Sequence, residues 1–159
     1  MEPTSEYGPV ESRLLEGGFE IPVASPALAS YQPAVRSGAF VFTAGQLPLH
    51  QGILLGKGPV GSVVSLETAR RCAEQAALNA LSAIRTLVPL SQIKSVVRLT
   101  GYVNAAPVFE EHPAVLNAAS DLLILAFNGA GRHVRSAVGV SSLPLGASLE
   151  LELTVALRD

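Results

Sequence analysis

The chain has 159 residues and a mass of 16.5 kDa, a length that predicts one domain. Hydrophobic residues make up 48 % of it, which excludes disorder. Its 11 basic and 13 acidic side chains leave a net charge of −2. Binding to a phosphate backbone requires clustered basic residues, and the sequence contains no such cluster, so nucleic acid is a poor partner.

The single cysteine, Cys72, can form no disulfide within the chain, and no Cys/His spacing indicates a zinc site. Residues 1–6 are acidic and polar, unlike a signal peptide. The longest wholly apolar run, residues 122–127, is too short to span a bilayer. We therefore expect a soluble cytoplasmic protein. The mean hydropathy of +0.38 is high for a small monomer, so part of the apolar surface is expected at an interface between copies.

In chain order, residues 1–18 are predicted to form a tail and a short helix that begins at Pro9, and residues 19–159 a single domain. Prolines break residues 19–33 into an extended loop. Residues 34–44 are rich in strand-forming residues and predict a hairpin that turns at Ser37-Gly38. The glycine-rich stretch that follows, up to residue 64, predicts a long loop.

Ser65 is predicted to cap a helix that runs to about Leu87, because apolar residues recur at helical spacing up to Pro89. Residues 93–104 predict a strand.

A second helix is predicted from about Pro113 to Asn128-Gly129. Residues 134–140 and 148–157 alternate between apolar and polar side chains, which predicts two further strands.

The order hairpin, helix, strand, helix, strand, strand predicts an α+β fold with both long helices on one face of a mixed sheet. The opposite face of the sheet would then be uncovered. We expect this face to carry Arg135, Glu150 and Glu152 and to meet solvent, a ligand or another subunit.

Two familiar motifs are weak here. Residues 56–61 form a G-x-G-x-x-G sequence, but Pro59 stiffens it and no acidic residue lies about 20 residues on, so a flexible loop is favoured over a dinucleotide site. No serine lies in a nucleophile elbow, which argues against a Ser-His-Asp hydrolase. Cys72 falls on an apolar helix face and is expected to be a packed thiol.

Arg135 is the most informative candidate, because an arginine inside a strand needs an anion for its guanidinium. One interpretation is a structural salt bridge to Glu150 on a neighbouring strand. The other is a clamp for a substrate carboxylate, with Glu150 handling a proton or a water molecule.

Several segments resemble one family. Residues 134–144 (VRSAVGVSSLP) and 149–152 (LELE) are similar to the C-terminal signature of the reactive intermediate deaminases, also called the YjgF or L-PSP endoribonuclease family. Tyr31 and residues 42–48 (FTAGQLP) are similar to the family's tyrosine and SGQ-P segment, and Asn117 to its helical asparagine. The resemblance covers residues 25–157 and points to a subgroup with longer chains.

The resemblance implies a chorismate-mutase-like fold, in which three subunits pack their sheets into a central barrel with pockets between neighbours. It also implies hydrolysis of enamines and imines such as 2-aminoacrylate to 2-oxo acids and ammonia, without metal or organic cofactor. By position, Arg135 would bind the substrate carboxylate, and Glu150 would orient water or supply a proton. The resemblance implies a pocket lined by Tyr31, Gly45, Asn117 and Ala137. Ala137 stands where the family's deaminases often have a cysteine.

Two alternatives stay open. The first is a non-catalytic protein that binds a small carboxylate in the same pocket. The second is a ribonuclease, against which the acidic pI of 5.9 and the 5 % aromatic content argue. The expected partners are therefore a small carboxylate and further copies of the chain, rather than a membrane or a nucleic acid.

Overall fold

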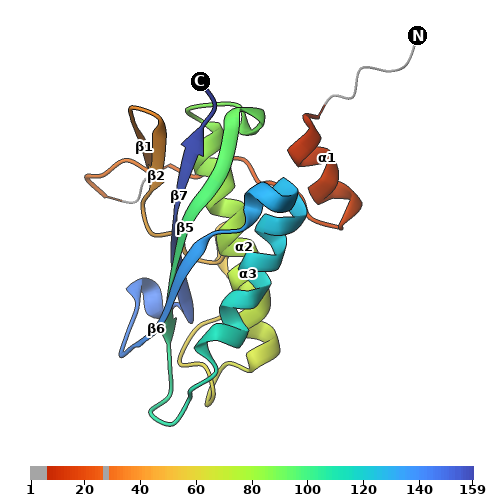
Figure 1. Ribbon diagram of the computed structural model, residues 1–159. Coiled ribbons are helices and arrows are strands. Elements are labelled where there is room, and N and C mark those ends of the chain that lie inside the picture. The colour runs from red at the N-terminus through yellow and green to blue at the C-terminus, as the bar shows by residue number, and fades with distance from the viewer. Residues whose placement is uncertain (1–6, 27–28) are drawn as a thin grey trace.

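The computed structural model describes residues 7–26 and 29–159, in which a layer of helices covers one face of a β-sheet (Figure 1). Within these residues the main sheet has five strands in the order β1-β2-β7-β5-β6. β5 and β6 are parallel, and the other neighbours are antiparallel. The strand bounds are β1 Ala34–Ser37, β2 Phe40–Thr43, β5 Ile93–Asn104, β6 Val134–Val140 and β7 Leu149–Leu157.

The long helices lie where the sequence predicts them. Their bounds are α2 Leu66–Arg85 and α3 His112–Phe127, and a short helix, α1 Pro9–Glu16, packs on α3. Ser65 caps α2, since its side-chain oxygen accepts a hydrogen bond from the backbone N–H of Thr68 at 3.1 Å. The predicted α+β class, with both long helices on one face of a mixed sheet, is confirmed (Figure 1). Residues 1–6 of the predicted tail lie outside the described residues.

The core lies between the helices and the sheet. Every second residue of β7 is buried there, and α3 contributes a row of fully buried side chains that includes Leu116 and Leu123. Each such side chain stabilises the fold by about 1.5–3 kcal/mol. By length and composition, the stretch His112–Gly131 could cross a membrane, but half of it is buried inside the fold, as in the core helix of a globular protein.

Two local differences from the prediction concern turns. The hairpin between β1 and β2 turns at Gly38-Ala39, one residue later than expected, because Ser37 still pairs with Phe40. The predicted long loop contains a small hairpin, β3 Leu49–His50 and β4 Ile53–Leu54. Strands of two residues are too short to show a periodicity. Short 3-10 turns, η1 Leu90–Gln92, η2 Asn128–Gly131 and η3 Pro144–Gly146, precede β5, β6 and β7.

The prediction that Arg135 lies on the uncovered sheet face is wrong. Arg135 pairs with Leu99 of the parallel neighbour β5, and paired residues of parallel strands share a face. Leu99 is buried under the helices. Val134 and Val138, 57 % and 44 % exposed, lie on the open face instead. β6 is an edge strand, so its alternation grouped the side chains correctly but did not determine which group faced the helices.

Candidate functional site

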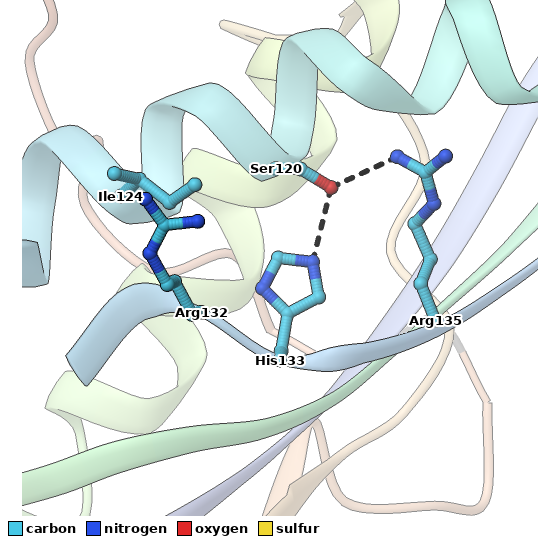
Figure 2. Close-up of a pocket in the computed structure, with 5 residues that line it drawn as sticks. All are labelled: Ser120, Ile124, Arg132, His133 and Arg135. Atoms are coloured by element: carbon cyan, nitrogen blue, oxygen red, sulfur yellow. Dashed lines mark hydrogen bonds between the residues drawn. The ribbon is translucent and has the colours of Figure 1, made fainter. Parts of the chain in front are cut away.

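Helix α3 holds the guanidinium of Arg135 in a fixed position. The Nη1 group donates a hydrogen bond to Asn117 Oδ1 at 2.9 Å. It donates a second one to Ser120 Oγ at 3.0 Å (Figure 2). These two residues are one turn apart and so share a face of the helix. The Nη2 group makes a long bond of 3.5 Å to the backbone oxygen of Pro113.

Every partner of Arg135 is neutral. Nη1 has two hydrogens and both are used, whereas the edge formed by Nε and Nη2 carries only the long bond to Pro113. Within residues 7–26 and 29–159 no carboxylate pairs with this guanidinium. The free edge has the planar pair of donors that matches the two oxygens of a carboxylate. The interpretation of Arg135 as part of a structural salt bridge with Glu150 in the same chain is therefore wrong.

Ser120 and His133 complete this cluster, and the sequence analysis did not identify them as site residues. His133 Nδ1 lies 2.7 Å from the backbone oxygen of Gly131, and Nε2 lies 3.0 Å from Ser120 Oγ. Since a carbonyl only accepts, Nδ1 carries a hydrogen. Ser120 Oγ lies within hydrogen-bond distance of both His133 Nε2 and Arg135 Nη1, so this hydroxyl links the two side chains. The signal in the sequence was that His133 and Arg135 share a strand face.

A pocket of about 200 Å³ opens beside this cluster between α3 and β6 (Figure 2). Its lining residues are Ser120, Ile124, Arg132, His133 and Arg135. None of them is acidic, so the pocket is a cationic site.

Glu150 lies on the open face of the sheet, as predicted, and its carboxylate rests against Gly45. The segment after β2 continues along β7, where Gln46 and Leu151 exchange backbone hydrogen bonds of 2.7 and 3.1 Å. A Cβ atom on Gly45 would overlap the Glu150 carboxylate, so only glycine leaves room for it. Burial, and then the charge of Glu152, raise the pKa of Glu150. This carboxyl group therefore keeps its proton to a higher pH than an ordinary glutamic acid.

Glu152 is the neighbouring acid on this face. It accepts a hydrogen bond of 3.2 Å from the hydroxyl of Tyr102, which lies opposite Glu150 in the register of β5 and β7. Burial raises the pKa of Tyr102, and the two carboxylates raise it further. The open face thus carries a patch of acidic groups, in contrast to the cationic pocket behind β6.

The structure divides the predicted site residues into two groups. Asn117 bonds Arg135, and Ala137 shares the helix-side face of β6 with it. Gly45 and Glu150 meet on the other face of the sheet. Tyr31, 46 % exposed, lies in the segment before β1. This segment runs beside Gly45, because the N–H of Ala44 donates to the backbone oxygen of Pro33 at 2.8 Å.

The glycine-rich segment 56–61 and Cys72 have structural roles in the packing of the fold. α2 begins at Leu66 and not at Gly61, and a Cβ on Gly56 would press on Cys72 and Ser148, so the loop interpretation of residues 56–61 is confirmed. Cys72 is fully buried, and burial raises the pKa of its thiol, as expected for a packed cysteine. In the described part of the chain, no three His, Cys, Asp or Glu side chains are grouped to hold a metal ion.

The structure is that of a small α+β protein with a cationic pocket beside its edge strand, and comparison with known proteins gives its family. Residues 11–156 match the family described as "YjgF/chorismate mutase-like, putative endoribonuclease", and the chain belongs to this family. The predicted family and its chorismate-mutase-like fold are thus confirmed.

Relatives support this assignment over nearly the whole chain. Protein TCP17 of Trypanosoma cruzi is 34 % identical over 154 residues, 96 % of each chain. The solved structure of Atu1372 from Agrobacterium tumefaciens, a protein of unknown function, is 39 % identical with a TM-score of 0.88, covering 94 % of this chain and 92 % of its own. A "putative endoribonuclease" from Shewanella oneidensis MR-1 is 35 % identical with a TM-score of 0.90, covering 94 % and 100 %.

Proposed function

We propose that this chain hydrolyses reactive enamines and imines that derive from amino acids, such as 2-aminoacrylate, to 2-oxo acids and ammonia. The observation that carries the proposal is the set of hydrogen-bond partners around the Arg135 guanidinium. Its guanidinium is held by neutral oxygens alone, and the edge that fits a carboxylate is open. A cation that is fixed in place without a counter-ion favours an anionic ligand.

In the proposed reaction, the substrate carboxylate binds the Nε/Nη2 edge of Arg135. Water attacks the imine carbon, a C–O bond forms, and the C–N bond breaks as ammonia leaves. A proton must leave the attacking water and another must reach the nitrogen. Glu150 orients the water or supplies the proton, a role that suits a carboxyl group whose pKa is raised by burial.

The proposed site requires two copies of the chain. Arg135 and Glu150 project from opposite faces of one sheet, so a single chain cannot present both to one substrate. We propose a homotrimer whose sheets form a central barrel and whose pockets lie between neighbours. The open face supports this, because it exposes a set of large apolar side chains that association would cover. They are Val35, Phe40, Phe42, Val134 and Val138. Light scattering should give the mass of a trimer, and a monomer at micromolar concentration would contradict it.

We further propose that the protein acts in the cytoplasm on small carboxylates rather than on RNA. Ala137 lies beside Arg135 on the same strand face, at the position of the family's usual cysteine, so substrate choice is expected to differ from that of the cysteine-containing deaminases. A non-catalytic binding protein with the same pocket is the alternative that the experiment must separate.

The test measures ammonia release from imines that an amino-acid oxidase forms in situ. The wild-type protein should accelerate it, and Arg135→Lys should slow hydrolysis of the acid but hardly that of its methyl ester. Carboxylate binding without ammonia release would show a binding protein. Cleavage of a labelled RNA by repurified protein, without ammonia release, would show a ribonuclease.

A further inference from the structure

The pocket beside Arg135 contains a second arginine. In Figure 2, Arg132 and Arg135 lie on either side of the pair formed by His133 and Ser120. No lining residue is acidic, and Asp121, the acid next to Ser120 along α3, is not part of the lining. Two guanidinium groups at one pocket repel each other unless anions neutralise them. Each of the two guanidinium groups at the pocket therefore favours an anionic ligand group beside it.

Arg132 differs from Arg135 in that nothing holds its side chain. Its backbone N–H donates to Gly129 at 3.3 Å, but its guanidinium has no hydrogen-bond or ion-pair partner among residues 7–26 and 29–159. It lies next to Ile124 at the far end of the pocket (Figure 2). This guanidinium is available to a ligand group that Arg135 cannot reach.

Building on the deaminase activity proposed above, we propose that the preferred substrates are imines of dicarboxylic amino acids. The 2-carboxylate binds Arg135, and the distal carboxylate binds Arg132 across the ring of His133. Arg132 follows the 3-10 turn η2 and precedes β6, whereas Arg135 lies within β6, and both side chains line the same pocket. They can therefore hold the two ends of one short molecule. The second carboxylate takes no part in the hydrolysis, so the bonds formed and broken are unchanged.

The size of the pocket agrees with such a ligand. A volume of about 200 Å³ compares with about 30 Å³ for one water molecule. The pocket thus accommodates a chain of four or five carbons that carries a carboxylate at each end. Ile124 provides an apolar contact for the methylene groups between them.

The experiment compares two 2-oxo acids that share the same head group. Calorimetry measures the binding of 2-oxoglutarate, a diacid, and of pyruvate, a monoacid. The preference for the diacid is also measured as the ratio of the kcat/KM values for the imines formed by oxidation of glutamate and of alanine. The wild-type protein should favour the diacid about fivefold, the size expected for one exposed ion pair. Arg132→Gln should remove this preference by weakening the diacid about fivefold more than the monoacid.

Arg36→Gln is the matched control. Arg36 is an exposed arginine on β1, the edge strand at the other side of the sheet from β6, and its loss should change neither ligand. The inference would be overturned if the wild type bound and hydrolysed diacid and monoacid equally well. It would also be overturned if Arg132→Gln lowered the affinity and kcat/KM equally for both. If alanine-derived imines are still hydrolysed in an Arg135-dependent way, the proposed function stands without it. A wild-type protein that releases no ammonia from either imine overturns both.

Discussion

The two faces of the sheet carry opposite chemistry. Behind β6, Arg132 and Arg135 line a pocket without an acid. On the open face, Glu150 and Glu152 lie together with Tyr102, and the charge of Glu152 helps raise the pKa of Glu150. The sheet keeps Arg135 and Glu150 apart within one chain, although the open face also carries a cation, Arg98, which shares that face with Val134. Under the proposed function, a second copy would supply to each face the group that it lacks.

The cationic side should be most sensitive at Arg135. Arg135→Lys keeps the charge but loses the planar pair of donors. Loss of one charge-assisted hydrogen bond should cost on the order of 1.5–3 kcal/mol, or roughly ten- to a hundredfold in kcat/KM for the acid substrate. Steady-state kinetics with the acid and its methyl ester measure this. If Arg135→Lys and the wild type show the same preference for acid over ester, Arg135 does not hold the carboxylate.

The acidic side should be most sensitive at Gly45. A Cβ there would overlap the carboxylate of Glu150 and push it out of place. We expect Gly45→Ala to lower kcat by about tenfold, less than the roughly hundredfold or more lost with an acid–base group, because the carboxyl group is displaced and not removed. Gly129→Ala is the control, because a Cβ at Gly129 meets open space. Equal kcat values for the two alanine variants would show that the position of Glu150 does not matter to the reaction.

Ser120 should have a smaller effect, because it acts through Arg135. Ser120→Ala removes one of the two bonds that fix Nη1 and leaves the bond to Asn117. We expect KM for the acid to rise by about threefold to tenfold, the value of one such bond, with kcat little changed. Ser120→Thr keeps the hydroxyl and should restore binding. A kcat effect without a KM effect would contradict a positioning role.

The smallest expected effect is the change in stability, as distinct from activity, when Glu150 loses its charge. Its pKa is raised above 4.5 in the folded state, so its protonated form favours folding. This contribution is fully present below 4.5 and is lost as pH rises through the raised value. Glu150→Gln should therefore be as stable as the wild type in acid and slightly more stable at neutral pH, as measured by urea unfolding. A less stable variant at neutral pH would mean that the charged form of Glu150 stabilises the fold.

The sequence predicted most of the architecture because periodicity reports burial directly. α2, α3, β5 and β7 each bury one continuous apolar stripe, and their bounds were predicted within a few residues. β6 has valines on one face and an arginine on the other, and either face can be the exposed one at a sheet edge. The face of Arg135 depended on polar partners from α3, 15 and 18 residues away, which no local pattern reports.

The candidate site was predicted as a list of residues but not as an arrangement. Asn117 and Arg135 do meet, and so do Gly45 and Glu150. The serine and histidine that orient Arg135 were missed, because hydrogen bonds to a backbone oxygen and across a helix face leave no spacing signature. The separation of Arg135 from Glu150 became visible only when the register between β5 and its two neighbours was known.

The central claim is that one working pocket takes Arg135 from one copy and Glu150 from another. It is tested by co-expressing Arg135→Ala and Glu150→Gln chains with different tags and purifying the mixed assemblies. Each homogeneous variant should be nearly inactive. Mixed assemblies should regain activity in about one pocket in three, because every mixed trimer has one junction at which an intact Arg135 meets an intact Glu150 of its neighbour. Mixed assemblies as inactive as the separate variants would contradict the shared pocket.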